Sequence, residues 1–136
     1  MNEPEMRERF AAARLAHLAT ADSDGMPHVV PVVFALDGDT IYFAVDQKPK
    51  RTRDLKRLRN IGMNPSVAVL VDHYEEDWNA LWWVRADGSA RVLDPGPDTE
   101  RAMQLLAGRH SQYRMQPPPG PAVAIAVHRW SAWSAR

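Results

Sequence analysis

The sequence predicts a mainly β (α+β) fold, in which an antiparallel barrel or sandwich carries short helices at its ends. Hydrophobic residues alternate with a period of two through most of the chain, and turns rich in Asp and Gly separate the alternating segments. No strand–helix–strand unit repeats, so a parallel sheet is not expected. The 136 residues, of which 45% are hydrophobic, suffice for one core, and we expect a single domain over residues 1–136.

The first third of the chain predicts one short amphipathic helix and three strands, over residues 3–13, 15–20, 28–36 and 40–45 in turn. Met6 and Phe10 recur at helical spacing in the first segment, and alternation begins at Leu15. The third segment is apolar on both faces, as expected where one face meets the core and the other meets a partner subunit or a cofactor. Pro31 lies within it and cannot donate to a ladder, which predicts an edge strand or a bulge.

The rest of the chain predicts two further helices and the remaining strands. In order, these are a helix over residues 53–62, a strand over 66–73, a hairpin of 81–86 and 89–93, a helix from 98 to about 110 and a last strand over 122–130. Thr52 is the expected N-cap of the first of these helices, and Asp98 that of the second. Asp87 and Gly88 have the composition of a hairpin turn. The expected total is six or seven strands and about three helices.

The overall composition narrows the classes of function. Seventeen Lys and Arg residues balance seventeen Asp and Glu, so no general field favours nucleic acid or an anionic membrane, and neither is an expected partner. The chain has no Cys, no secretory signal in its charged segment 1–14 and no hydrophobic run of membrane-spanning length, so we expect a soluble, cytoplasmic protein. The five His residues lack metal-binding spacing, and no metal site is predicted.

A basic segment at residues 48–59 is the strongest local charge anomaly. Its cationic residues are Lys48, Lys50, Arg51, Arg53, Lys56, Arg57 and Arg59. They lie at the start of a predicted helix, where unpaired N–H groups and the macrodipole attract an anion, and Arg adds bidentate geometry. The segment therefore predicts a phosphate site. A solvated cationic face and a nucleic-acid surface are the alternatives, and the neutral total charge argues against the second.

Several segments together resemble one known family, the pyridoxamine 5'-phosphate oxidase-like split β-barrel flavoproteins. The matching stretches are residues 18–22, 24–32, 48–55, 64–65 and 69–72. Residues 72–78, 81–88 and 130–133 are further similar to a subgroup of the branch that uses the deazaflavin coenzyme F420. The resemblance implies a six-stranded antiparallel split barrel, a homodimer paired across a broad face, and cofactors in the clefts between the subunits.

The resemblance also assigns residues to the cofactor by position. Those of the basic segment are Lys48, Lys50, Arg51, Thr52, Arg53 and Lys56, which would hold the phosphate and begin a track for the glutamyl tail of F420. Either Lys50 or Arg51 makes the main phosphate contact. His28, Val30 and Pro31 would line the site of the tricyclic ring, and Trp78 would reach over from the partner subunit.

The activity implied is hydride transfer between reduced F420 and a conjugated small-molecule acceptor. The cofactor would carry the chemistry, and no catalytic residue is predicted. FMN in the same cleft, as in flavin reductases and pyridoxamine-phosphate oxidases, is the alternative. A non-enzymatic module that binds flavin, F420 or haem is the second alternative. Quinones, tetrapyrroles and enones are admissible acceptors.

Aromatic residues near the chain's last strands have weaker assignments. Trp82 and Trp83 are adjacent in a predicted strand, so one is expected in the core and the other toward a cofactor or partner. Arg85 shares a face with Trp83 and would reach either an anionic substrate or a structural ion pair. Trp130 and Trp133 are interpreted as dimer or barrel packing.

Overall fold

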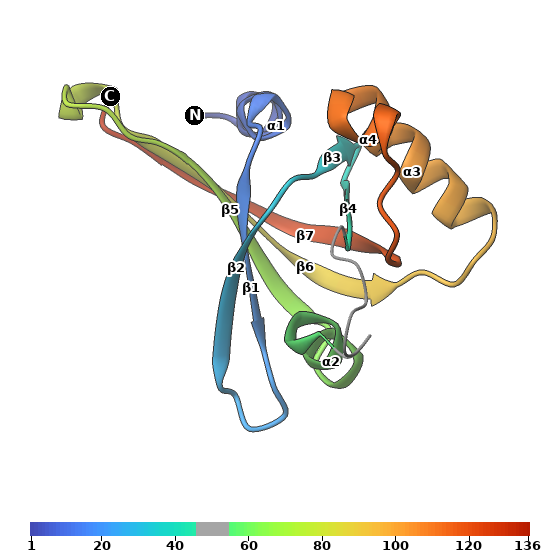
Figure 1. The fold of residues 1–136 in the computed structure, drawn as a ribbon. Coiled ribbons are helices and arrows are strands. Elements are labelled where there is room, and N and C mark those ends of the chain that lie inside the picture. The colour runs from blue at the N-terminus through green and yellow to red at the C-terminus, as the bar shows by residue number, and fades with distance from the viewer. Residues whose placement is uncertain (46–54) are drawn as a thin grey trace.

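The computed structural model describes residues 1–45 and 55–136, and these form an antiparallel sheet of seven strands that curls into a half-open barrel (Figure 1). The strand order is β2-β1-β5-β6-β7-β4-β3. The strands are β1 Ala16–Ala21, β2 Pro27–Val32, β3 Ala35–Asp37, β4 Thr40–Ala44, β5 Ser66–His73, β6 Trp82–Val92 and β7 Ala122–Ser134. The prediction of a mainly β, antiparallel fold is confirmed.

Helices cover the ends of this sheet. Within the described residues they are α1 Glu3–Ala12, α2 Lys56–Met63, α3 Pro97–Arg109 and α4 Ser111–Met115, with a 3₁₀ turn η1 at Trp78–Ala80. Asn2 caps α1, because its side chain accepts a hydrogen bond of 2.9 Å from the backbone N–H of Glu5. Gly96, not Asp98, is the N-cap of α3, and Asp98 is instead a first-turn acid. The sequence did not predict α4, whose five residues are too few for a periodic signal.

The segment 28–36, predicted as one strand, is two strands. β2 ends at Val32 and β3 begins at Ala35, and these two strands lie at opposite ends of the sheet order. Phe34 between them is fully buried, and its ring centroid lies 5.0 Å from that of Phe10 in α1. The chain therefore leaves one edge of the sheet and joins the other. Pro31 lies in the edge strand β2, as predicted, and its missing N–H is not needed by a further neighbour.

β6 is one long strand and not the predicted hairpin. Asp87 and Gly88 lie within it, and the register with β7 shifts between them. A Cβ on Gly88 would overlap the backbone of Ala126 in β7, so only glycine allows this approach. The Asp-Gly pair thus marks a bulge at which β6 and β7 come close. Because Asp-Gly is also common in tight turns, the sequence predicted a hairpin here.

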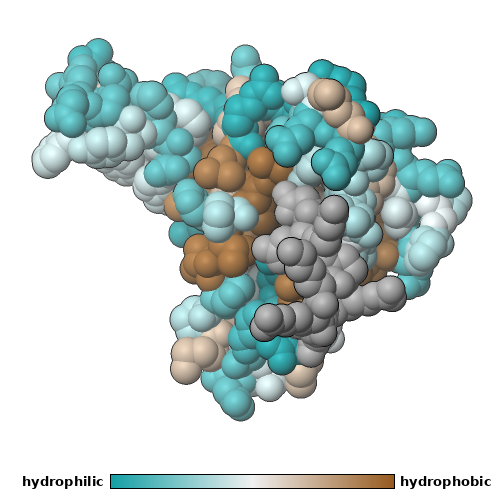
Figure 2. All heavy atoms as spheres, viewed as in Figure 1, coloured by the Kyte–Doolittle hydropathy of each residue, from teal (hydrophilic) through white to brown (hydrophobic). Residues whose placement is uncertain are grey.

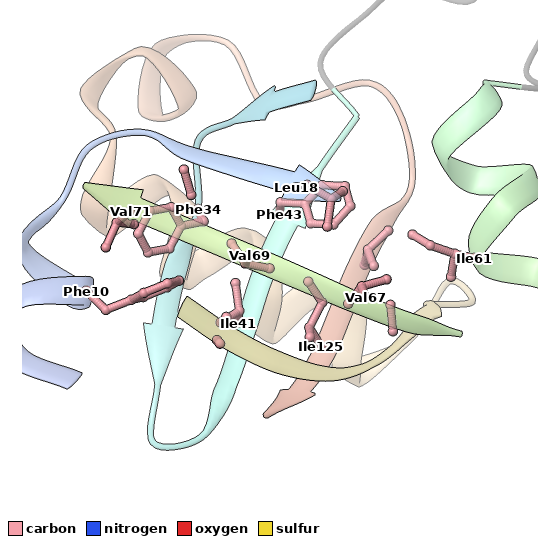
Figure 3. Packing of buried hydrophobic residues seen from close by; sticks show 14 of the residues in the cluster. Phe10, Leu18, Phe34, Ile41, Phe43, Ile61, Val67, Val69, Val71 and Ile125 are labelled. Carbon is pink, nitrogen blue, oxygen red and sulfur yellow. The ribbon is translucent and has the colours of Figure 1, made fainter. Parts of the chain in front are cut away.

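The core lies inside the curl of the sheet. Figure 3 shows Phe10, Leu18, Phe34, Ile41, Phe43, Val69 and Ile125 pointing into it from α1 and several strands. Alternate residues of β5 are buried, from Val67 through Val69 to Val71. Trp130 packs against this cluster, makes an edge contact with Phe10 at 5.2 Å and donates from Nε1 to Asp39 Oδ1 at 3.1 Å. Trp130 therefore has the barrel-packing role that its sequence position predicts.

The ends of β5, β6 and β7 extend beyond the barrel with η1 and the C-terminus (Figure 1). We call this extension, residues 73–82 and 132–136, the arm. A hydrogen bond of 3.0 Å from Ala135 N to Leu81 O holds its two parts together. No helix among the described residues is long and apolar enough to cross a membrane.

Candidate functional site

Five residues of the predicted phosphate site lie outside the described residues: Lys48, Lys50, Arg51, Thr52 and Arg53. The described part of the basic segment is Lys56, Arg57 and Arg59 in α2. α2 begins at Lys56 with Leu55 as its N-cap, so the prediction of Thr52 as N-cap is wrong. The pattern of Leu55, Leu58 and Ile61 marked the correct helix face but not its first residue.

The N-terminal turn of α2 has the properties of an anion site. No side chain in the described part of the chain caps it, and no acidic residue lies in its first turn. Its first N–H groups therefore have no partner within the helix, and the positive end of the macrodipole adds to the charges of Lys56 and Arg57. An anionic ligand at this end would satisfy N–H donors and offset charge at the same time.

An ion pair joins the start of α2 to the turn between β1 and β2. Lys56 Nζ lies 3.6 Å from Asp22 Oδ2. The Asp22 carboxylate also accepts hydrogen bonds of 2.9 Å from the backbone N–H groups of Met26 and Asp24. The bond from Met26 is the main reason that the pKa of Asp22 lies below its ordinary value of 3.8, and Lys56 lowers it further.

A buried polar contact fixes α2 against β1. Asn60 and Thr20 are exposed by only 2% and 3%, and Asn60 Nδ2 donates to Thr20 Oγ1 at 3.0 Å. His28 lies directly opposite Thr20 in the register of β1 and β2. Arg57 lies one turn before Asn60 on α2. Within residues 1–45 and 55–136, His28 Nδ1 and Arg57 Nε are both buried atoms without a hydrogen-bond partner, which is unusual for buried polar atoms.

A groove of about 390 Å³ lies on the outer face of the sheet. Its lining is mostly apolar and comes from four neighbouring strands: His17 and Ala19 of β1, Val29 of β2, Ala68 and Leu70 of β5, and Trp83 and Arg85 of β6. Figure 2 shows hydrophobic residues gathered at the centre of one face, in the part of the view that β1 and β2 occupy in Figure 1. Grooves of this size and polarity are typical of small-molecule sites.

Arg85 is the charged residue of this groove. Its guanidinium lies 5.5 Å from the Trp83 ring centroid, and its Nε lies 3.4 Å from Asp87 Oδ1. Arg85 therefore makes the structural ion pair that was one of its two predicted roles. Arg85 Nε thus has the Asp87 carboxylate as its partner, while the hydroxyl of Ser131, opposite Arg85 in β7, is buried without a hydrogen-bond partner among the described residues. Arg85 thus brings a positive charge to the groove beside the Trp83 ring.

The predicted ring residues are only partly brought together. Alternation in β2 turns the half-buried His28 and Val30 to one side of the strand and Pro31 to the other, and Val30 packs on the core. Val29, which the sequence analysis missed, is the β2 residue that lines the groove, and it is 61% exposed. The period of two that assigned the strand could have found it. Trp78 lies on the arm in η1, 69% exposed.

The two adjacent tryptophans separate as predicted. Trp82 is half-buried and packs against the core cluster, while Trp83 lines the outer groove. Trp133 lies opposite Trp83 in the register of β6 and β7 and is 47% exposed. Among residues 1–45 and 55–136, no three His, Asp or Glu side chains come together as metal ligands.

The curled antiparallel sheet, with helices at its ends and a groove on its outer face, defines a split β-barrel protein. The chain belongs to the pyridoxamine 5'-phosphate oxidase family, which matches residues 3–134. No curated protein matches the sequence.

Solved structures share this fold at low sequence identity. The conserved protein Rv2991 of Mycobacterium tuberculosis is 21% identical, with a TM-score of 0.78 over 100% of this chain and 86% of that one. An FAD-binding protein of Mesorhizobium loti is also 21% identical, with a TM-score of 0.74 over 97% and 94% of the two chains. HutZ, a haem storage protein of Vibrio cholerae, is 16% identical, with a TM-score of 0.75 over 97% and 93%.

Proposed function

We propose that this chain is the subunit of a homodimeric, cytoplasmic F420-dependent reductase, which passes a hydride from the reduced deazaflavin to a conjugated small molecule. The observation that carries the proposal is the basic first turn of α2, where, among the described residues, no side chain caps the helix and Arg57 Nε is buried without a hydrogen-bond partner. A cofactor phosphate would satisfy that turn. Family membership supports a flavin-like cofactor, and Lys56 and Arg57 extend the basic segment far enough to favour the tailed F420 over FMN.

The residues of the outer groove fit a flat, largely apolar ring system. Trp83 and Leu70 offer apolar surface, and the Arg85 guanidinium offers a positive charge and N–H donors for ring substituents. When bound, the reduced deazaflavin supplies the hydride. The chain's residues would hold the ring, exclude water from its face and fix the acceptor, and such positioning can contribute roughly 7–11 kcal/mol to rate acceleration.

We propose that a second copy covers the outer face of the sheet and completes this cleft. The apolar side chains of Val29, Leu70, Trp83 and Trp133 lie on a face that an isolated antiparallel sheet would turn to water. The arm extends away from the barrel and carries the exposed Trp78. It would reach the cleft of the partner. Val29→Lys should therefore shift the protein from dimer to monomer in light scattering, and a monomeric wild type would refute the pairing.

The decisive experiment is a parallel fluorescence titration of the purified protein with F420 and with FMN. Wild type is expected to bind F420 more tightly than FMN. Arg57→Gln should raise the Kd for F420 about tenfold or more, because a charged hydrogen bond to phosphate contributes about 1.5–3 kcal/mol. Arg101→Gln is the matched control. Arg101 lies on α3 and pairs at 3.2 Å with Asp37 of β3, the strand at the other end of the sheet order from β2.

Each other outcome supports a different function. Tighter binding of FMN would favour the flavin reductase or pyridoxamine-phosphate-oxidase-like alternative. Tight binding of a flavin, F420 or haem without turnover of any quinone, tetrapyrrole or enone would favour a binding module. Equal affinities of wild type and Arg57→Gln would refute the phosphate assignment to α2.

A further inference from the structure

A second groove, of about 490 Å³, lies between α1 and the base of the arm. It is lined by Arg9, Ala12, Ala13, Arg14, Leu15, His17, Asp72, His73 and Trp82. His17 also lines the outer groove, so the two grooves meet at this side chain. The outer groove is mostly apolar, whereas the second groove carries two arginines. Together they form one surface with an apolar end and a cationic end.

Arg9 is the side chain that most needs a ligand there. It is half-buried on α1, and its guanidinium lies 5.1 Å from the Trp82 ring centroid. It makes no hydrogen bond or ion pair with any residue that the structure describes. A guanidinium has five N–H donors, which all point outward in its own plane. Contact with the face of the Trp82 ring gives none of these donors a hydrogen-bond acceptor. The in-plane donors are thus free to bind a carboxylate in the bidentate manner.

The surrounding charges favour an anion. Arg14 uses Nη1 to donate to Arg109 O at 3.0 Å, which leaves its other nitrogens available. Among the described residues that line this groove, Asp72 carries the carboxylate. Outside the lining, Glu75 Oε1 lies 2.9 Å from His73 Nε2. Arg9, Arg14 and Asp72 therefore line the groove beside the planar rings of Trp82 and His73, which stack at 16° with centroids 6.1 Å apart.

We infer that this joined surface binds a planar, apolar molecule that carries a carboxylate, with the carboxylate on Arg9 and the apolar body toward His17 and the outer groove. If the proposed function holds, this names the acceptor class as conjugated carboxylic acids. Neutral quinones and enones would then be poor substrates. The binding itself requires only the two grooves and no cofactor.

The test is a fluorescence anisotropy titration without F420 or FMN, using 1-pyrenebutyrate and its neutral amide as probes. The two probes share one planar body and differ in the charge. Wild type is expected to bind the acid about ten times more tightly than the amide. Arg9→Gln should weaken the acid to the level of the amide and leave the amide unchanged. Arg91→Gln is the control, because Arg91 lies in neither groove and pairs with Asp98 at 3.4 Å.

A third variant keeps the test independent of folding. Arg9→Lys retains the charge near the C-terminal end of α1 but lacks the planar fork, so it should recover part of the acid's affinity. Equal binding of acid and amide by wild type, or loss of the acid's affinity in Arg91→Gln as large as in Arg9→Gln, would overturn the inference. Because no cofactor is present, failure of the F420 titration would not affect this result.

Discussion

The buried contact between Asn60 and Thr20 offers a quantitative test of how α2 is held. Both side chains are almost fully buried, and Asn60 Nδ2 donates a hydrogen bond of 3.0 Å to Thr20 Oγ1. Thr20→Val would leave the Asn60 amide without that partner, and Asn60→Leu would leave the Thr20 hydroxyl alone. Each single change should lower the free energy of unfolding by about 1–3 kcal/mol, the cost of an unsatisfied buried polar group.

The double variant distinguishes this explanation from simple loss of packing. Replacing both partners with apolar groups of similar shape removes the unsatisfied group, so the double variant should be more stable than the sum of the single effects predicts. Urea denaturation of the four proteins measures the coupling, which should be about 1 kcal/mol or more. Additive losses would refute the role of the hydrogen bond. Measuring the Kd for F420 with the same four proteins tests whether the position of α2 affects binding of the cofactor phosphate.

Three further predictions follow from the fold. Gly88→Ala should lower the free energy of unfolding by at least about 1–3 kcal/mol, or prevent folding, because the added Cβ would overlap the backbone of β7. Urea denaturation measures this loss. Gly62→Ala is the control, because a Cβ at Gly62 meets open space. Asp22→Asn should lower the free energy of unfolding at neutral pH. Because the depressed pKa of Asp22 adds stability only while the carboxylate is charged, the difference in unfolding free energy between variant and wild type should shrink as the pH falls below 3.8. Phe10→Ala should cost about 3–5 kcal/mol by the same denaturation assay, since Phe10 is fully buried between Phe34 and Trp130.

Local sequence signals predicted most of the strands, and long-range geometry accounts for the errors. Alternation located β1, and β-branched and aromatic residues located β4, because one face of each strand is buried in the core. It could not separate β2 from β3, since the apolar run continues through Val33 and the buried Phe34, and the change of sheet edge leaves no local mark. Gly88 was misread for the same reason: its partner, Ala126, is distant in the sequence.

The site was harder to predict than the fold, because its residues meet only after four strands are ordered. The basic start of α2 is a local charge pattern and could be read directly from the sequence. The outer groove combines β1, β2, β5 and β6, whose adjacency follows from the sheet order and not from spacing along the chain. Alternation would have turned Val29, Ala68 and Leu70 outward, yet it gives no means of knowing that they share one surface with Trp83.

His17 shows why the order of strands matters for function. In the sequence it alternates with apolar neighbours, which is typical of a strand residue with structural partners. In the structure it is exposed, lies opposite both Pro31 and Leu70, and lines the outer groove and the Arg9 groove alike. A ligand with an apolar body in one groove and a carboxylate in the other must therefore contact the His17 side chain, which both grooves share. A bulky His17→Trp should therefore weaken the acid probe and F420 together, whereas independent grooves would let it affect only one.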